Sequence, residues 1–273
     1  DGKGELVESW TSGKEAEDKN ADGSVKPHKV KLVAGKYTLS EVTPPTGYVT
    51  ADDITFTIAL NGSVTSAPTD AVSKDGNKII ITMKDALQER DIEISKVDAT
   101  DGVTELAGAE LQITDESGNV VKDKDGKELS WVSGVDGTNE DGTVKPHKIK
   151  LVAGTYILKE VSAPFGYLTA APITFKVNLD GTLYSIAESA VLNEETRVAV
   201  IMQDAANEVE ISKVDAADGT TELAGAKLKI TDMEGNTIKD KDGNELSWVS
   251  GEAAEDKNED GSAKAHKVKL SPG

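Results

Sequence analysis

The chain has 273 residues, enough for two or three β-domains, and a formal net charge of −19 that argues against nucleic-acid binding, which needs a basic face. It contains no apolar run of about 18 residues and no basic-then-apolar leader, so we expect neither a membrane span nor a signal peptide within it. Cysteine is absent, which excludes disulfides, thiol catalysis and cysteine-ligated zinc.

The sequence repeats itself nearly verbatim, which is typical of tandem domains. KPHKVKLVAGKYTLSEVTPPTGY at 26–48 returns as KPHKIKLVAGTYILKEVSAPFGY at 145–167, and EISKVDATDGVTELAGAELQITD at 93–115 returns as EISKVDAADGTTELAGAKLKITD at 210–232. We therefore expect three segments: residues 1–90, a repeat lacking its first strands; residues 91–208, a complete repeat; and residues 209–273, the N-terminal half of a further repeat.

Within the complete repeat, short runs of alternating apolar and polar residues are separated by turns rich in Gly, Asp and Asn, the pattern of β-strands and hairpins. In chain order the expected strands are IEISKV (92–97), AELQIT (109–114), HKIKLV (147–152), TYILKEV (155–161), ITFKVNL (173–179) and RVAVIMQ (197–203). This spacing predicts an all-β chain of tandem antiparallel β-sandwich domains. Because the joins between repeats are short, we expect the domains to be arranged end to end as a stiff rod.

Three of these strands carry an ionisable residue on their apolar face, because alternate residues of a strand share a face. Lys96 follows two isoleucines at every second position, Glu160 follows a tyrosine and a leucine, and Asp204 follows two valines and a methionine. Burying three charged groups is costly unless they are paired or neutralised. The same pattern places Glu41 and Asp85 in the first segment and Lys213 in the third.

Three interpretations of these residues are open. Each residue could lie where its strand emerges into water, or the three could form a buried salt bridge. The third interpretation is covalent, since desolvation favours a neutral amine, which is a nucleophile, and a protonated carboxyl, which is an electrophile. On that interpretation Lys96 and Asp204, and likewise Lys213 and Asp85, are cross-linking residues, while Glu160 and Glu41 are the catalytic proton carriers. The product is an isopeptide bond formed once, without enzymatic turnover.

At these residues the sequence resembles the Cna B-type (SpaA-like, prealbumin-like) domains of Gram-positive pilins and adhesins. The run YILKEVSAPFGY from Tyr156 to Tyr167 is similar to the family's E-box, Y-x-L-x-E-x-x-A-P-x-G-Y, and the first repeat carries it as YTLSEVTPPTGY, with Pro44 in place of the alanine. LAGAEL, starting at Leu106, and ISKVD, starting at Ile94, resemble the family's second strand and its lysine-bearing strand. The resemblance implies an Ig-like, prealbumin-like sandwich with an intramolecular isopeptide bond between its first and last strands.

The partner of the lysine is an asparagine in most members of that family. Here the matching positions read Met-Gln-Asp204-Ala and Met-Lys-Asp85-Ala, which resembles the less common Lys–Asp subgroup. Asn207 is an alternative acceptor, but it lies outside the apolar row, so we favour Asp204. The first segment has no lysine strand and the third has no carboxyl partner, so Lys213 of one molecule could join Asp85 of the next, although residues 242–273 duplicate residues 2–35 and would compete for the same space.

The resemblance also implies a role. It indicates structural stalk or spacer repeats of a Gram-positive cell-surface adhesin or pilus-type protein, secreted and anchored to the cell wall. We expect no cofactor, neighbouring repeats of the same chain as partners, and any host surface ligand to bind domains outside this segment. The alternative is a ligand-binding adhesive module, for matrix protein or glycan, in the same fold; near-identical repeats favour spacers.

Three weaker patterns have simpler explanations. The Asp-rich loops at 123–126 and 240–243 lack the spacing of an EF-hand, so we interpret them as hairpin turns and not as calcium sites. Each repeat has one histidine, which is too few for a metal cluster. We expect each histidine to lie at a solvent-facing strand edge. Each repeat also has one tryptophan, which we expect to serve packing. These residues are His28, His147 and His266, and Trp10, Trp131 and Trp248.

Overall fold

The computed structural model describes residues 2–65, 67–76, 78–195, 197–240 and 242–271. The chain divides into two compact units, residues 1–88 and residues 89–273. Helical structure in the described ranges is confined to three single 3-10 turns: η1 (Ala16–Asp18), η2 (Glu188–Ala190) and η3 (Ala254–Asp256). None of the helices found there is long and apolar enough to cross a membrane.

The first unit consists of short antiparallel strands. They are β1 (Gly35–Leu39), β2 (Tyr48–Val49), β3 (Ile54–Ile58), β4 (Val64–Thr65), β5 (Val72–Asp75), β6 (Lys78–Ile81) and β7 (Ala86–Leu87). They pair as a three-stranded sheet in the order β1-β3-β4 and as the two-stranded sheets β2-β7 and β5-β6. Tyr37 and Phe56 stack in its small core, with ring centroids 5.7 Å apart.

The second unit begins with the residues of the complete repeat. Its strands are β8 (Arg90–Asp98), β9 (Glu110–Thr114), β10 (Ser130–Val132), β11 (His147–Leu151), β12 (Gly154–Ser162), β13 (Ile173–Val177), β14 (Leu183–Ser185), β15 (Val191–Asn193) and β16 (Val198–Asp204). One sheet has the order β10-β9-β12-β13-β14 and the other the order β11-β8-β16-β15. The inward faces of both sheets enclose one apolar core, so this repeat is a β-sandwich.

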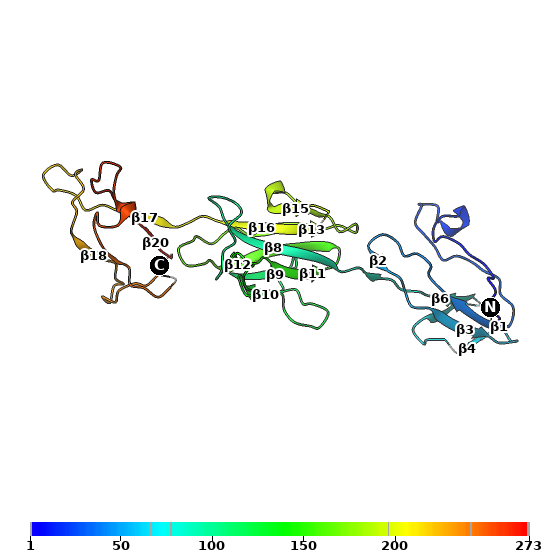
Figure 1. Ribbon diagram of the computed structural model, residues 1–273. Coiled ribbons are helices and arrows are strands. Elements are labelled where there is room, and N and C mark those ends of the chain that lie inside the picture. Colours follow the sequence, from blue (N-terminus) through cyan, green and yellow to red (C-terminus); the bar gives the residue numbers. More distant parts are fainter. Residues whose placement is uncertain (1, 66, 77, 196, 241, 272–273) are drawn as a thin grey trace. The chain divides into compact units, whose positions relative to one another are not determined.

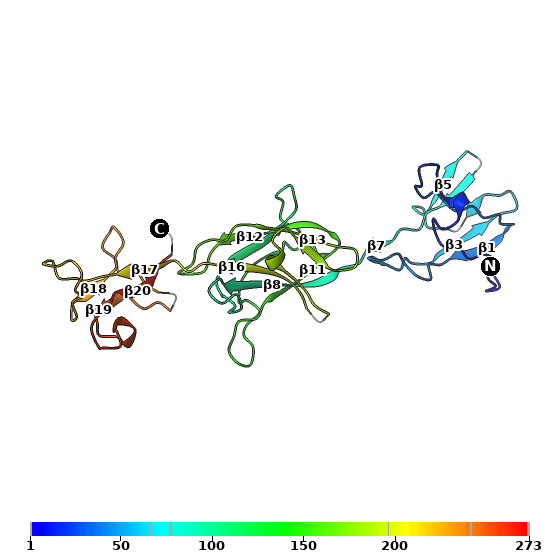
Figure 2. The ribbon, with the colours of Figure 1, turned by 90° about the horizontal axis from the view of Figure 1, so that it is seen from above.

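The expected strand periodicity is visible in the burial pattern. Ile92, Ile94, Leu158, Val200 and Met202 are all buried in the core, and the polar residues between them mostly face outward. The all-β prealbumin-like fold expected from the sequence is confirmed. One pairing differs from the expected antiparallel pattern, since the strands at the two ends of the repeat, β8 and β16, run parallel and side by side (Figures 1 and 2).

The parallel pairing fixes where the ends of the two strands lie. Its register places Met202 opposite Lys96, and Asp204 opposite Asp98. Because parallel strands cannot be joined by a tight hairpin, the whole sandwich lies between them in the sequence. The fold therefore brings the lysine of the first strand beside the aspartate of the last strand.

The Asp-rich loop at 123–126 forms a hairpin turn, as expected. Asp123 Oδ1 accepts hydrogen bonds from the backbone N–H groups of Asp125 and Lys127, both at 2.9 Å. Gly126 completes the turn with a φ of 80°, a conformation that favours glycine. Side-chain capping of a turn therefore accounts for these aspartates.

The rest of the second unit is less regular. It contains β17 (Glu208–Ile211), β18 (Lys227–Lys229), β19 (Ser247–Val249) and β20 (His266–Lys269), paired as β17-β20 and β18-β19. The division expected after residue 208 falls at the start of β17, inside the second unit. The assignment of three segments to three repeats therefore stays a prediction.

Candidate functional site

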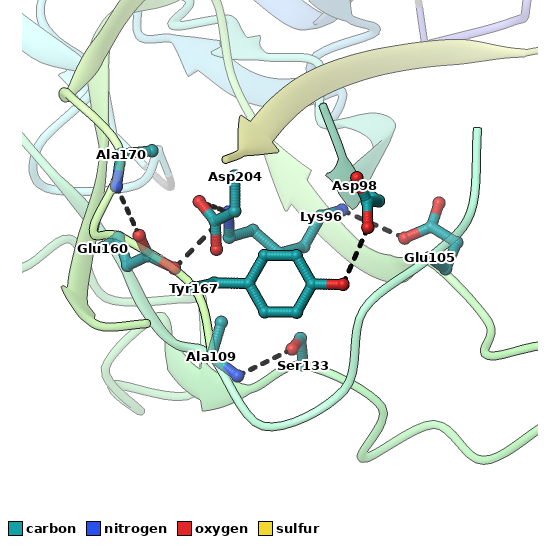
Figure 3. Close-up of polar contacts among 9 residues, drawn as sticks. All are labelled: Lys96, Asp98, Glu105, Ala109, Ser133, Glu160, Tyr167, Ala170 and Asp204. Carbon is teal, nitrogen blue, oxygen red and sulfur yellow. Dashed lines mark hydrogen bonds and ion pairs between the residues drawn. The ribbon is translucent and has the colours of Figure 1, made fainter. Parts of the chain in front are cut away.

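Three ionisable side chains meet in the interior of the complete repeat. Lys96 comes from β8, Asp204 is the last residue of β16, and Glu160 comes from β12 in the opposite sheet (Figure 3). Their side chains are 1%, 0% and 0% exposed, respectively. Lys96 Nζ contacts Asp204 Oδ1 and lies 3.4 Å from Glu160 Oε1. The interpretation that these residues lie in water at strand ends is therefore wrong for this repeat, because all three side chains are buried.

The amine of Lys96 and the carboxyl groups of Asp204 and Glu160 have few polar neighbours other than one another. No other group of the described residues makes a hydrogen bond to Lys96 Nζ, to Glu160 Oε1 or to either carboxylate oxygen of Asp204. The neighbouring side chains of the same core, Ile94 and Met202, are apolar. A charged group in this apolar environment is stabilised only by its ionic partners. Transfer of a proton from the amine to a carboxylate neutralises both charges and so avoids the cost of burying them.

One hydrogen bond from the backbone orients the glutamate. Glu160 Oε2 accepts a 2.6 Å hydrogen bond from the backbone N–H of Ala170, which leaves Oε1 facing Lys96 (Figure 3). The first repeat has the same contact, a 2.8 Å hydrogen bond from the backbone N–H of Ala51 to Glu41 Oε2. Sequence reasoning missed this donor, since any residue except proline supplies a backbone N–H.

The electrostatics of the site make the aspartate easier to protonate than an aspartate in water. Burial raises the pKa of Asp204 to about 6, and the nearby carboxylate of Glu160 acts in the same direction, while Lys96 opposes both. A neutral acid beside a neutral amine has the same number of protons as the ion pair, but no charge to desolvate. The arrangement can therefore place a nucleophilic amine against the carbon of a protonated carboxyl, with a second carboxyl beside both.

The E-box tyrosine closes the end of the site. Tyr167 pairs with Ala206 just beyond β16, and the backbone N–H of Leu168 donates to Ala205 O at 2.9 Å. The hydroxyl of Tyr167 donates a 2.7 Å hydrogen bond to Asp98, the residue opposite Asp204 in the sheet (Figure 3). The chain around residue 167 therefore fixes the position at which β16 ends.

The corresponding residues of the partial repeats are placed differently. In the first unit Glu41 and Asp85 are neighbours, and burial raises the pKa of Asp85, with the charge of Glu41 and a hydrogen bond to it adding to the effect. Lys213, in the second unit, is exposed. A bond between Lys213 and Asp85 of another copy stays a prediction.

The alternative acceptor, Asn207, is engaged elsewhere. Its Nδ2 donates a 2.7 Å hydrogen bond to Leu270 O, and its own carbonyl accepts a 3.0 Å hydrogen bond from the backbone N–H of Leu270. Asn207 lies beyond the end of β16 and takes no part in the buried cluster. The structure brings Asp204, and not Asn207, to Lys96.

The expectation for the histidines is confirmed for the place of His147, the first residue of edge strand β11, but not for its exposure. His147 stacks on Trp131 with ring centroids 4.4 Å apart, and its Nδ1 lies 2.6 Å from Asp136 Oδ2. The other repeats show the same arrangement, as Trp10 with His28 and Trp248 with His266, at 4.5 and 4.3 Å. Each histidine is half-buried between an indole and a carboxylate and does not point freely into solvent.

In the ranges that the structure describes, no group of three or more His, Asp or Glu side chains is arranged to hold a metal ion.

Comparison with known proteins gives a family and several similar structures. The sequence matches the SpaA prealbumin-like fold domain over residues 1–84 and 90–189. It is similar to the Bacillus anthracis TIE protein, at 29% identity and a TM-score of 0.35, over 87% of this chain and 35% of that chain. No curated protein matches the sequence.

Two further solved structures are pilus proteins by name. The pilus adhesin SpaC from Lactobacillus rhamnosus GG, in its open conformation, is 19% identical over 64% of this chain and 25% of that chain, with a TM-score of 0.35. BcpA, the major pilin subunit of Bacillus cereus, is 18% identical over 67% of this chain and 41% of that chain, with a TM-score of 0.31. The chain spans less than half the length of each of these three proteins.

Proposed function

Because the chain belongs to the family of SpaA prealbumin-like fold domains, we propose that it forms stalk repeats of a Gram-positive cell-surface adhesin or pilus-type protein. In this proposal a spontaneous isopeptide bond between Lys96 and Asp204 stiffens the complete repeat. The observation that carries it is the buried contact of Lys96 with Asp204, beside Glu160, between the first and last strands of one domain.

The bond forms by condensation of an amine with a carboxylic acid. A proton moves within the ion pair from Lys96 to Asp204, which gives a neutral amine and a protonated carboxyl. Nζ then attacks Cγ of Asp204, the bond from Cγ to the hydroxyl oxygen breaks, and one water leaves. Glu160 accepts the proton that the attacking nitrogen loses and returns it to the departing hydroxyl, so atoms and charge balance.

The site contains the groups that each step of this reaction requires. Attack needs the amine against the carboxyl carbon, which the contact of Lys96 with Asp204 supplies. Proton transfer needs a carboxyl within reach of the nitrogen, which Glu160 Oε1 supplies at 3.4 Å. The reaction consumes its side chains, so the domain reacts once and is not an enzyme with turnover.

The position of the bond gives it a mechanical role. Tension along the chain enters this repeat at the start of β8 and leaves at the end of β16. A covalent bond from Lys96 to Asp204 carries the tension directly between these two strands and bypasses residues 97–203. The sandwich then stays folded under loads that would otherwise separate β8 from β16.

The proposal includes a location and partners. The protein is placed outside the cell on the surface of a Gram-positive bacterium, attached to the cell wall through regions beyond this segment. The repeats contact neighbouring repeats of the same chain, and a host ligand is left to other domains. The near-identity of the repeats supports a spacer role over an adhesive one.

Single-molecule pulling on the whole chain tests the mechanical role. The parent should show no extension step from the complete repeat, whereas Glu160→Gln should release about 100 residues, roughly 350 Å at 3.3–3.6 Å per residue. Glu41→Gln is the matched control, because that glutamate has the same backbone hydrogen bond and an aspartate beside it, but belongs to the first unit. A parent that releases the same length as Glu160→Gln would rule out the proposed bond.

A further inference from the structure

The backbone of the buried lysine has partners that the strand pairing does not supply. The pairing of β8 with β11 ends at Ile94 and His147, so Lys96 lies two residues beyond it. Residues two apart in a strand direct their N–H and C=O groups to the same edge of that strand. The N–H and C=O of Lys96 therefore point to the same edge of β8 as those of Ile94, beyond the point where the pairing with β11 ends. A buried N–H without an acceptor is costly, so this edge needs another partner.

A loop that follows β8 supplies it. The backbone N–H of Lys96 donates a 3.0 Å hydrogen bond to Oε2 of Glu105 (Figure 3). The carbonyl of Lys96 accepts a 2.6 Å hydrogen bond from the backbone N–H of Leu106. Both polar groups of the lysine backbone are therefore held by two consecutive residues, one through its side chain and one through its backbone.

The same contacts recur in the third repeat. There the backbone N–H of Lys213 donates a 3.0 Å hydrogen bond to Glu222 Oε2, and the backbone N–H of Leu223 donates a 2.6 Å hydrogen bond to Lys213 O. Lys213 is exposed, and it belongs to a different unit from Asp85. The same contact between a glutamate side chain and a lysine backbone therefore occurs at Lys96, which contacts Asp204, and at Lys213, which is exposed.

From these contacts we propose that Glu105 is a positioning residue for the bond-forming reaction, acting through the backbone of Lys96. This inference rests on the proposed function, because it assigns a residue to the proposed reaction. Glu105 itself touches neither the amine nor the carboxyl; it fixes the Cα from which the lysine side chain reaches Asp204.

The charged neighbours of Glu105 support an ordered side chain. Arg197 donates to Glu93 Oε2 at 2.6 Å and to Ser95 Oγ at 2.8 Å, and its charge also acts on Glu105. Burial raises the pKa of Glu105, while Ser95, the backbone N–H of Lys96 and Arg197 lower it. The carboxylate therefore sits among donors that hold it against the edge of β8.

The expected size of the effect follows from geometry. A misplacement of about 1 Å at a reacting group can slow a reaction about 100-fold. Without Glu105 the backbone of Lys96 loses one of its two hydrogen bonds to this loop and keeps the other, which the backbone N–H of Leu106 donates. We therefore expect bond formation to slow by roughly 10- to 100-fold and not to stop.

The experiment measures how fast the full chain loses one water after a pulse of cell-free synthesis, by intact mass in acid-quenched samples. Glu105→Ala removes the acceptor and should slow the loss roughly 10- to 100-fold. Glu105→Gln keeps an acceptor oxygen at the same reach without the charge and should react at the parental rate. Glu105→Asp keeps the charge but shortens the reach and should be as slow as Glu105→Ala.

Glu222→Ala is the matched control and should leave the rate unchanged. Should Glu105→Ala fail to fold, the comparison of Glu105→Asp with Glu105→Gln decides, since each keeps one property of the carboxylate. Parental rates for Glu105→Ala and Glu105→Asp would overturn the inference, and so would a Glu105→Gln variant as slow as Glu105→Asp. A parent that never loses water would instead overturn the proposed function, so the two failures are distinguishable.

Discussion

Replacing Glu160 with Gln should leave the complete repeat folded but unbonded. The amide oxygen of Gln can still accept the hydrogen bond from the backbone N–H of Ala170, so the side chain keeps its place. What it loses is the carboxyl that carries the proton away from Lys96 Nζ, 3.4 Å distant. The variant should therefore keep the full sequence mass, while the parent is lighter by one water.

The stability of this variant can be worked out from the loop that the bond closes. A bond from Lys96 to Asp204 closes a loop of about 100 residues, and the chain-entropy model gives about 4–5 kcal/mol for a loop of that size. For a domain of about 120 residues, an unfolding entropy of about 2.1 cal/mol/K per residue makes 1 kcal/mol shift the melting temperature by about 4 °C. Glu160→Gln should therefore lower the melting temperature of the complete repeat by roughly 15–20 °C.

Scanning calorimetry on the full chain measures this shift, with Glu41→Gln as the control for losing a half-buried glutamate outside the complete repeat. The control should lower only the transition of the first unit. A Glu160→Gln protein that still loses water would show that Glu160 is not the proton carrier. An unbonded variant that melts with the parent would show that loop closure does not stabilise the domain as reasoned.

Three further predictions concern the core and the titrating groups. In the Glu160→Gln background, Leu158→Ala should lower the free energy of unfolding by about 2–5 kcal/mol in urea melts, because the leucine is 0% exposed. Val161→Ala is the control: that valine is 57% exposed, so its replacement should change the free energy of unfolding by less than about 0.5 kcal/mol. Equal effects of the two substitutions would show that Leu158 does not lie in the core as described. Lys96→Met removes the cation that opposes the raised pKa of Asp204, so the pKa of Asp204 in the folded variant lies above the value of about 6 that it has beside Lys96. The folded variant then binds more protons than the unfolded one from pH 3.8 to above pH 6, and its stability should fall as the pH rises through that window. Adding Asp204→Asn should remove that fall, and its persistence would locate the titration elsewhere. Hydrogen bonds to Glu8 and Asp18 raise the pKa of His28 above 6.5, so its stabilisation is complete below pH 6.5 and lost as the pH rises through the folded value. With Trp131 and Trp248 replaced by Phe, the emission of Trp10 should rise as the stacked imidazolium loses its proton, with a midpoint above 6.5 that Glu8→Gln lowers; an unmoved midpoint would refute the assignment.

Strand periodicity was sufficient to find the buried cluster. Lys96, Glu160 and Asp204 each continue an apolar row at every second position, and a two-residue period assigns them to the core face whatever the neighbouring strands are. The repeats made the pattern visible twice more, at Glu41 and Asp85 and at Lys213. The direction of pairing did not follow, because alternation is the same for parallel and antiparallel strands.

Contacts that depend on loops were not predictable in the same way. Glu105 and Ala170 reach the cluster through a side chain from a turn and through a backbone N–H, and neither belongs to a periodic run. The stacking of His147 on Trp131 joins residues at the ends of a long loop, so no local pattern indicates it. Repetition of the tryptophan and the histidine in all three repeats was the available clue, and it marked them without specifying their partners.

The intact mass of the purified chain under denaturing conditions shows whether the isopeptide bond has formed. The mass should be lower than that of the sequence by one water, and proteolysis should yield one branched peptide in which Lys96 is joined to Asp204. Lys96→Met should restore the full mass. A parent chain at the full sequence mass, or a branched peptide that joins Lys96 to Asn207, would contradict the proposed bond between Lys96 and Asp204.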